Sequence, residues 1–294
     1  MMIGRFLEYL RYERNKSVLT VQNYGEDLLK FELFFKKMDG HLSWESVDSD
    51  VIREWMDSMM VNGNSASSVC RRLSALRAFF RFALLSGIVD TDPTRFVRNP
   101  RTERPLPQFL KEKEMNELLD GDGMWDETFD DVRDRAVIMM FYETGIRLAE
   151  LVALDDASVD FSKRQAKVTG KRNKQRIIPF GEGLAEALRG YVLLRDNTVA
   201  GRSGALFVSD DGMRLTRGQI QYMVKKRIGM VSTLKKRSPH VIRHTFATSL
   251  LNNGADIKSI KELLGHESVV TTEIYAHVTF EELKRIYKHA HPRA

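Results

Sequence analysis

Residues 238–251 read SPHVIRHTFATSLL, a segment with helical periodicity and two basic side chains near its start. Ser238 is the expected N-cap, and the three-residue spacing of His240 and Arg243 places both side chains on one face of the helix. The N-terminus of a helix also favours an anion, because its backbone N–H groups carry partial positive charge. The segment therefore predicts a helix that presents an imidazole and a guanidinium to a group such as a phosphate.

Four other segments carry reactive side chains at points where the chain is expected to turn. Arg147 follows a glycine at a helix end in ETGIRLAEL, and Lys171 lies at the tip of a basic hairpin, VTGKRNKQRIIP. His266 follows a glycine in LLGHES, where a left-handed turn would direct its ring away from the helix. Tyr275 comes nine residues later, in TTEIYAHV. Each residue taken alone is more often an ordinary packed or solvated side chain than a catalytic one. Arg147 could simply form an ion pair with Glu150 on the same helix.

Taken together, these two arginines, one lysine, two histidines and one tyrosine suffice to attack a phosphodiester without a metal. The arginines can neutralise the phosphate oxygens, the lysine can protonate the leaving oxygen, and the tyrosine can be the nucleophile. A phenol with a pKa near 10 is only about 0.1% ionised at pH 7, so the tyrosine needs a nearby base and positive charge. The combination indicates DNA cleavage and rejoining through a phosphotyrosine.

The composition is that of a globular chain, and its charge distribution favours a polyanionic partner. The chain has 294 residues, 43% hydrophobic and 29% charged, which allows two domains of ordinary size. The net charge is +6, but residues 161–243 hold 19 Lys or Arg against 5 Asp or Glu, whereas residues 109–160 hold 5 against 15. The basic block is the expected footprint of DNA, although any one cluster within it is better explained by solvated charge.

The location predicted from the sequence is the cytoplasm. A single cysteine, Cys70, cannot form an intramolecular disulfide, which is typical of a reducing compartment. No apolar run approaches the roughly 20 residues of a membrane span, and the first residues lack the apolar core of a signal peptide. We therefore expect no contact with a membrane.

Residues 1–97 are predicted to form an N-terminal domain of four helices. Thr20 is the expected N-cap of the second helix, and Asp48 or Ser49 is the expected N-cap of the third. The fourth helix is expected to end at Gly87. The fourth helix carries arginines away from its apolar side, which is equally consistent with contact to a DNA backbone and with a solvated basic face. These arginines are Arg71, Arg72, Arg77 and Arg81, and the expected buried side is Leu73, Leu76, Phe80 and Leu84.

A second domain is predicted over residues 109–294, after a basic, proline-rich linker at 98–108. Its pattern is two helices, then strand, turn, strand, turn and strand, and then further helices. The fold class expected for the whole chain is mainly α with a small antiparallel β-sheet. A final amphipathic helix is expected within residues 279–290.

In order and spacing, the strings TGIRLAEL, TGKRNKQRIIP, HVIRHTFAT, LLGHES and TEIYAHV resemble the motifs of the tyrosine recombinase (phage integrase) family. The run RDRAVIMMFYETGIRLAEL and the ending HPRA are most similar to Xer-type recombinases. The resemblance covers the whole second domain, and the first has the length of the family's core-binding, SAM-like domain. We expect no arm-binding domain before it, which would argue against the larger integrases. The hairpin sequence GKRNK departs from the family pattern, which often has a second glycine after the lysine; we expect this to change the stiffness of the turn and not the catalytic set.

The resemblance implies a role for each of the six residues and for several other basic side chains. The six are Tyr275 as the nucleophile that forms a 3′-phosphotyrosine, Arg147 and Arg243 as phosphate clamps, Lys171 as general acid, His240 as acid and base, and His266 as hydrogen-bond donor. Arg172 and Lys174, at the hairpin tip, join the four helix arginines as expected DNA contacts. No cofactor and no metal is expected.

The expected partner is double-stranded DNA with inverted half-sites, bound by a homo- or hetero-tetramer of like recombinases. The resemblance also implies a helix at 279–290 that is exchanged between protomers, although packing on its own domain is equally open. The Xer resemblance further implies control by a septal DNA translocase and resolution of chromosome or plasmid dimers before cell division. It also implies a nucleoid-associated location in a bacterium or archaeon.

Three other functions stay open at the level of sequence. The chain could be an integrase or invertase of a mobile element, or a sequence-specific DNA-binding protein without catalysis. A metal-dependent nuclease would use the acidic residues within 120–131, but their irregular spacing in a glycine-containing loop favours solvated charge.

Overall fold

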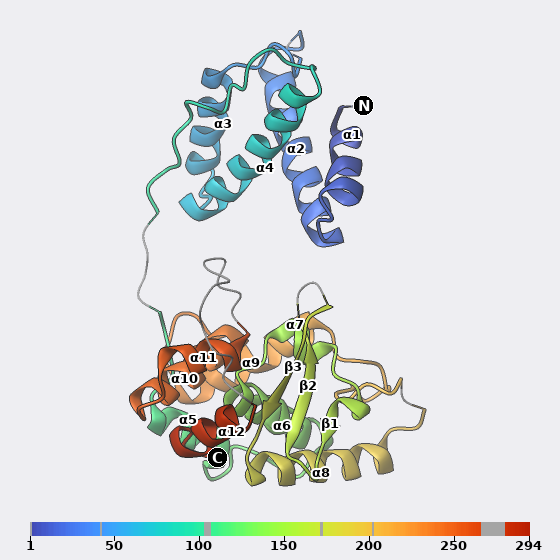
Figure 1. Ribbon diagram of the computed structural model, residues 1–294, viewed down its shortest axis with the longest axis vertical. Coiled ribbons are helices and arrows are strands. Elements are labelled where there is room, and N and C mark those ends of the chain that lie inside the picture. Colours follow the sequence, from blue (N-terminus) through green and yellow to red (C-terminus); the bar gives the residue numbers. More distant parts are fainter. Residues whose placement is uncertain (1, 42, 103–106, 171–172, 202, 266–279) are drawn as a thin grey trace. The chain divides into compact units, whose positions relative to one another are not determined.

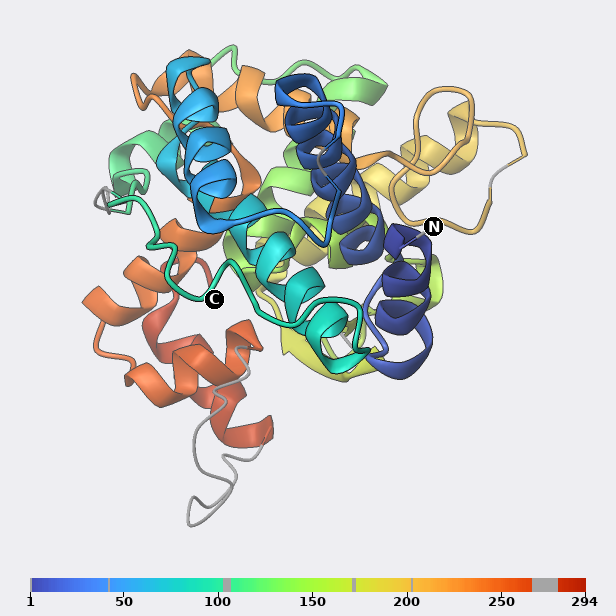
Figure 2. The same ribbon diagram turned by 90° about the horizontal axis from the view of Figure 1, so that it is seen from above.

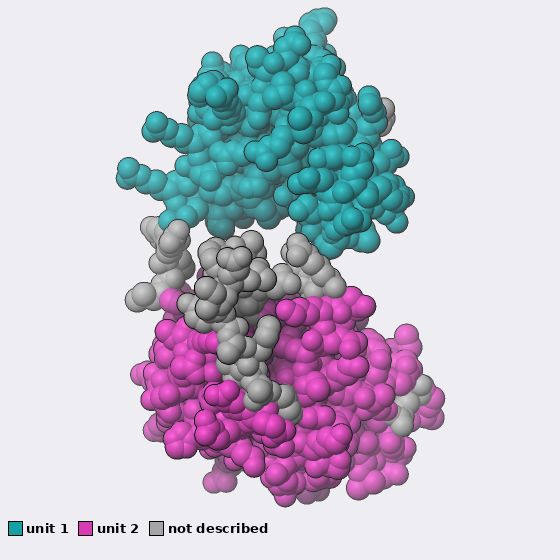
Figure 3. All heavy atoms as spheres, viewed as in Figure 1, with its two compact units in different colours: residues 1–105 teal, residues 106–294 magenta. Residues whose placement is uncertain are grey.

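The computed structural model describes residues 2–41, 43–102, 107–170, 173–201, 203–265 and 280–294. The chain forms two compact units, residues 1–105 and 106–294, which are coloured separately in Figure 3. The division falls within the proline-rich stretch 98–108.

The first unit is built from helices (Figure 1), and its core is rich in aromatic side chains. Trp44, in the loop after the second helix, lies 4.4 Å from Phe79 and 5.3 Å from Phe35 between ring centroids. Rings of this size bury a large apolar area, so they dominate the stability of a small helical unit. The helices are α1 (Met2–Glu8), a π-helical turn (Tyr9–Glu13), α2 (Val18–Met38), α3 (Ser49–Val61) and α4 (Ala66–Leu85).

The start of α2 differs from the predicted one. Ser17 occupies the N-cap in extended conformation, and its side-chain oxygen accepts a hydrogen bond from the backbone N–H of Thr20 at 3.3 Å. Thr20, the expected cap, therefore lies inside the first turn. Both are hydroxyl residues, and only the backbone conformation decides which of them ends the loop. Of the two predicted caps of α3, Asp48 and Ser49, the structure has Asp48, whose carboxylate accepts from two backbone N–H groups.

The buried side of α4 also departs from the prediction at one position. Leu73, Leu76 and Phe80 are buried as expected, but Leu84 is 42% exposed. The apolar stripe passes through Ala83 instead, three residues after Phe80. A period of 3.6 residues permits a step of three or four, so sequence spacing alone does not choose between these neighbours.

The second unit combines helices with a three-stranded antiparallel sheet, which confirms the predicted fold class (Figure 1). The sheet order is β1-β2-β3, with Ala166 opposite Ile178 and Val168 opposite Arg176. The strands are β1 (Val159–Asp160), β2 (Gln165–Thr169) and β3 (Gln175–Pro179). The helices are α5 (Glu112–Asp120), α6 (Phe129–Thr144), α7 (Leu148–Val152), a 3₁₀ turn (Asp156–Ser158), α8 (Glu182–Thr198), α9 (Arg217–Val231), α10 (Pro239–Asn252), α11 (Ile257–Leu264) and α12 (Phe280–Ala290).

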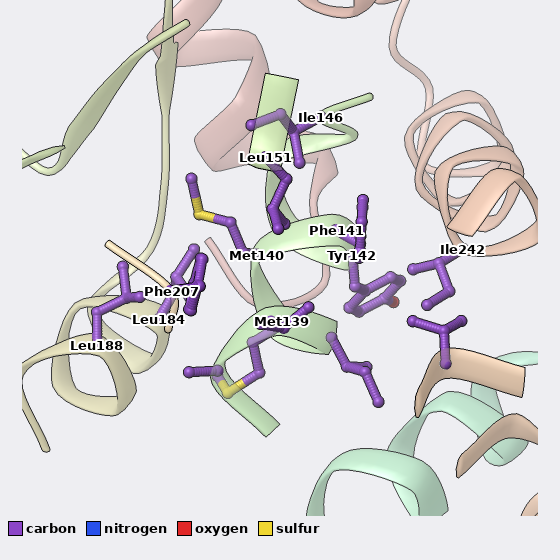
Figure 4. Close-up of a cluster of buried hydrophobic side chains, with 14 of the residues drawn as sticks. Met139, Met140, Phe141, Tyr142, Ile146, Leu151, Leu184, Leu188, Phe207 and Ile242 are labelled. Carbon is purple, nitrogen blue, oxygen red and sulfur yellow. The ribbon is translucent and has the colours of Figure 1, made fainter. Parts of the chain in front are cut away.

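Helix α6 is the centre of this unit. Every residue from Ala136 to Thr144 is buried, so the helix is covered on all sides. Figure 4 shows its side chains among residues of its neighbours, including Leu151 of α7, Leu184 of α8 and Ile242 of α10. The helix ends at Gly145, whose left-handed conformation (φ 58°) turns the chain toward α7.

Helix α12 packs against α10 and α11 of its own unit, and Figures 1 and 2 both show the three helices grouped. Tyr287 and Ala290 are buried against Phe246 and Leu250 of α10. His291, just beyond the helix, stacks on Tyr287 with ring centroids 5.1 Å apart. In this chain the predicted C-terminal helix therefore docks on its own domain.

Candidate active site

Three consecutive backbone carbonyls at the C-terminal end of α11 each accept a hydrogen bond from a different arginine. The pairs are Arg176 Nε to Leu263 O at 3.2 Å, Arg243 Nη2 to Leu264 O at 2.7 Å, and Arg147 Nη2 to Gly265 O at 2.6 Å. The last carbonyls of a helix have no partner within it and carry the negative end of the helix dipole. Guanidinium groups from three other elements therefore converge on this point.

Arg147 is held at the start of α7 by Glu150. Its backbone N–H donates to Glu150 Oε2 at 2.9 Å, and its Nη1 donates to Glu150 Oε1 at 2.8 Å. The left-handed turn at Gly145 brings Arg147 out of the buried α6 and leaves its side chain partly exposed. One face of the guanidinium is thus fixed by protein groups, while the residue stays accessible.

Arg243 lies in the second turn of α10 and is only 8% exposed. It donates hydrogen bonds to the backbone oxygens of Gly145 and Leu264. Burial, together with the nearby charges of Arg147 and Arg176, lowers the pKa of Arg243 to about 10. The group remains a cation at neutral pH, so the site concentrates positive charge.

His240 lies in the first turn of α10, as the sequence predicts, and its side chain is exposed. Ser238 occupies the predicted N-cap position, but its side chain forms no capping hydrogen bond. Pro239, at the first helical position, has no backbone N–H, so the helix start has one donor fewer that a cap would have to satisfy. The structure therefore buries Arg243 and leaves His240 open at the helix start.

Lys171, Arg172, His266 and Tyr275 lie outside the described residues. The structure does describe the residues that lead to two of them. The backbone N–H of Gly170 donates to Lys174 O at 2.7 Å and closes the hairpin before Lys171. Gly265 ends α11 with φ 64°, which confirms the left-handed turn expected before His266.

The hairpin and α4 residues expected to contact DNA differ in their surroundings. Lys174 and Arg81 are exposed. Arg71 and Arg72 both pair with Asp27, a buried carboxylate, and their side chains are 50% and 19% exposed. Arg77 donates to two oxygen atoms of the segment after α4, at 2.8 and 2.7 Å. Arg71, Arg72 and Arg77 are thus each engaged by oxygen atoms of their own unit, whereas Arg81 is exposed.

Three of the acidic residues within 120–131 are engaged by arginines. Asp120 pairs with Arg135 and Arg293, Asp130 with Arg133, and Asp131 with Arg227. Within the described ranges, no group of three or more His, Cys, Asp or Glu side chains is arranged to hold a metal ion. These carboxylates serve as ion-pair partners of the second unit.

Sequence analysis did not identify Arg176 as a site residue, although a signal for it exists. In QRIIP it lies two residues before Ile178, which is buried, so the alternation of a strand directs both side chains to the same face. An arginine on the inward face of a strand requires a partner, because an unpaired buried charge is costly. That partner is Glu150, which accepts hydrogen bonds from Arg176 at 2.7 and 2.9 Å.

Comparison with known proteins identifies the family. Residues 108–282 match the model described as "Phage integrase family", and residues 3–87 match "Phage integrase, N-terminal SAM-like domain". The chain belongs to the phage integrase family. The predicted recognition as a tyrosine recombinase most similar to the Xer type is thereby confirmed, as is the predicted pair of a SAM-like and a catalytic domain fold.

Full-length relatives carry the names of Xer recombinases. Tyrosine recombinase XerC of Chlorobaculum parvum is 40% identical over 314 residues, which cover 98% of this chain and 94% of the relative. Tyrosine recombinase XerC of Chlorobaculum tepidum is 38% identical over 317 residues, with coverage of 99% and 94%. The chain is therefore an enzyme of the tyrosine recombinase class, whose strand exchange passes through a phosphotyrosine.

Solved structures agree with this fold. XerA recombinase is 29% identical with a TM-score of 0.50, covering 100% of this chain and 99% of its own. XerH site-specific recombinase, bound to a palindromic difH substrate in a post-cleavage complex, is 21% identical with a TM-score of 0.73, covering 99% and 92%. The second likeness shows the fold alone. Among the helices of the described part of the chain, none is both long and apolar enough to span a membrane.

Proposed function

We propose that this chain cleaves and rejoins double-stranded DNA at specific sites through a 3′-phosphotyrosine on Tyr275, and so resolves chromosome or plasmid dimers. The observation that best supports the proposal is the convergence of Arg147 and Arg243 on the end of α11. Two fixed guanidinium groups, one partly exposed and one buried, form a site suited to a phosphodiester. The name XerC of the full-length relatives supports the cellular role.

The arginines act on the charge of the reacting phosphate. Arg147 and Arg243 now donate to backbone carbonyls, and a bound phosphate would receive these donors through its two non-bridging oxygens. Negative charge on those oxygens grows as phosphorus becomes five-coordinate. Donors that are positioned in advance stabilise that charge without reorganising, which is the largest contribution that such a site can make to the rate.

The bond changes follow from the roles of the other residues. The Tyr275 oxygen forms a bond to phosphorus while the bond from phosphorus to the 5′ oxygen breaks, and His240 takes the phenol proton. Lys171 gives a proton to the leaving 5′ oxygen. A 5′-hydroxyl from a partner duplex then attacks the phosphotyrosine, and the tyrosine recovers its proton. One phosphoester replaces another in each step, so no nucleotide is consumed.

The proposal includes an assembly on DNA. Four protomers, of this chain alone or with a second recombinase, would bind two sites with inverted half-sites, and a septal DNA translocase would activate them in the cytoplasm at cell division. Arg71, Arg72, Arg77 and Arg81 of α4, with Arg172 and Lys174 of the hairpin, are the proposed backbone contacts. Arg71 and Arg72 also pair with Asp27. The proposal also includes domain limits of 1–97, 98–108 and 109–294. Helix α12, which docks on its own domain in this structure, would be exchanged between protomers when they assemble on DNA.

A suicide-substrate assay tests the proposed function. Wild type, Tyr275→Phe and Tyr222→Phe are incubated with nicked candidate recombination sites, and adducts that resist SDS are counted. Tyr222 is an exposed residue of α9 and serves as the matched control. We expect adducts with wild type and Tyr222→Phe, and DNA binding without adducts with Tyr275→Phe. An adduct that persists in Tyr275→Phe would contradict the assignment of the nucleophile.

A further inference from the structure

Arg176 of β3 joins the segments that bear the proposed catalytic residues. All three of its nitrogen groups are used: Nη1 and Nη2 donate to Glu150 at 2.7 and 2.9 Å, and Nε donates to Leu263 O at 3.2 Å. Its side chain also lies close against Gly265, where an added Cβ atom would come within 3.1 Å of Arg176 Nε. A single side chain therefore connects β3 with α7 and with the end of α11.

Glu150 is shared between two arginines. The carboxylate is only 3% exposed, and each of its oxygens accepts from both sides: Oε1 from Arg147 Nη1 and Arg176 Nη1, Oε2 from the Arg147 backbone and Arg176 Nη2. Burial would raise the pKa of Glu150, but the hydrogen bonds from Arg176 and Arg147 outweigh it and hold the pKa below its usual value. The group is therefore an anion beside Arg147.

The pairing matters because one carboxylate can neutralise one arginine. With Arg176 present, Glu150 is compensated by the two-pronged bond from β3, and Arg147 and Arg243 keep net positive charge for a phosphate. Without Arg176, the same buried anion has Arg147 as its remaining guanidinium partner among these residues. A closed Arg147–Glu150 pair would be poorly placed to bind a phosphate oxygen.

We propose that Arg176 is a positioning residue of the recombination reaction: it pairs with Glu150 and so keeps Arg147 available to the scissile phosphate. This inference rests on the proposed function, in which Arg147 holds that phosphate. Arg176 itself is expected to touch neither the phosphate nor the nucleophile. Its effect on the reaction passes through Glu150.

A double-mutant cycle separates this role from a structural one. Wild type, Arg176→Met, Glu150→Gln and the double variant are compared for DNA affinity and for the rate of adduct formation at saturating suicide substrate. Arg189→Met is the matched control, because Arg189 forms an exposed pair with Glu182 on α8. Thermal melting checks that each variant is folded. The variant Arg176→Lys is added as a more conservative change, because it keeps the positive charge but not the two-pronged bond.

We expect Arg176→Met to slow adduct formation about 10- to 100-fold with little loss of affinity, since a misplaced catalytic group costs this much. Glu150→Gln in the same chain removes the anion that holds Arg147, so the double variant should recover roughly tenfold. Arg176→Lys should fall between wild type and Arg176→Met. Arg189→Met should react like wild type.

Other outcomes overturn the inference. A double variant as slow as Arg176→Met, or slower, would assign Arg176 to direct phosphate contact or to plain stability. An Arg176→Met protein that reacts at the wild-type rate would overturn this inference alone. If wild type itself forms no adduct on a site that it binds specifically, the proposed function fails, and the inference fails with it.

Discussion

Glu143 is a carboxyl group at the end of α6 with no exposed surface. Its Oε2 accepts a hydrogen bond from the backbone N–H of Gly181 at 3.2 Å, and the hydroxyl of Tyr287 lies 3.5 Å away. Its Oε1 has no partner among the described residues. Burial raises the pKa of Glu143 from 4.5 to about 7, against the opposing effects of Gly181 and Arg293. Ionisation of this group is therefore a cost to the folded state above neutral pH.

The replacement Glu143→Gln should stabilise the protein at pH 8 but not at pH 5. The folded pKa exceeds the unfolded one, so the contribution of Glu143 is complete below about pH 4.5 and is lost as the pH rises through 7. A shift of this size corresponds to about 3 kcal/mol. Urea unfolding of the variant and wild type across pH 5–8 measures the difference. Glu186→Gln, at an exposed position of α8, is the control, and an equal pH dependence in all three proteins would refute the prediction.

The replacement Lys171→Ala should slow cleavage of ordinary DNA and recover on DNA with a sulfur atom at the 5′-bridging position. A leaving alkoxide needs a proton from Lys171, whereas a thiolate does not. Single-turnover cleavage of the two substrates by wild type and variant measures the rescue. A defect of the same size on both substrates would remove Lys171 from the role of general acid.

At the scale of elements, the turn between α6 and α7 determines where Arg147 lies. Gly145 has φ 58°, and a Cβ atom there would lie 2.5 Å from the ring of Phe246 and 2.8 Å from Leu264. Gly254 also has a positive φ, 85°, but open space around the Cβ position. The two glycines thus share the backbone requirement and differ in packing.

The replacement Gly145→Ala should destabilise the protein by roughly 3 kcal/mol, whereas Gly254→Ala should cost about 1 kcal/mol. Both variants carry the strain of a left-handed residue, and only the first also overpacks the core between α10 and α11. Chemical denaturation measures the two losses. Equal losses would show that the close approach at Gly145 is relieved by a shift of Phe246.

Sequence patterns predicted the elements well where a single local signal was decisive. The glycine ends at Gly145 and Gly265 are both confirmed. The patterns failed where two local solutions have similar energy, as with the two hydroxyl residues before α2 and the two apolar neighbours near the end of α4. Tertiary packing decides such cases, and sequence spacing does not contain it.

The candidate site was predictable as a set of residue types but not as a geometry. Arg147 and Arg243 were identified from their motifs, yet nothing in those motifs shows that both bind the end of α11. Arg176 was missed because its importance comes from Glu150, which lies 26 positions earlier on another element. Contacts of this kind depend on the packed fold and not on any one segment.

For the molecule as a whole, the uneven charge distribution predicts strongly salt-dependent DNA binding. The logarithm of the affinity should fall by about 0.9 per logarithm of salt concentration for each phosphate neutralised. The replacement Arg81→Ala removes an exposed cation and should therefore reduce the slope by about 0.9, the contribution of one phosphate. Arg72→Ala should instead lower the stability of the first unit, because Arg72 pairs with the buried Asp27. Fluorescence anisotropy over a series of salt concentrations measures the slope for wild type and each variant. A slope that is unchanged in Arg81→Ala would place Arg81 outside the DNA interface.

The central claim is that strand exchange passes through a 3′-phosphotyrosine on Tyr275. The most direct measurement is to digest the covalent adduct from a suicide substrate and identify the DNA-linked peptide by mass spectrometry, while the released strand is tested for a free 5′-hydroxyl. The account predicts a peptide modified at Tyr275 and a 5′ end that a polynucleotide kinase labels directly. Linkage to another residue, or a released strand that already carries a 5′-phosphate, would contradict it.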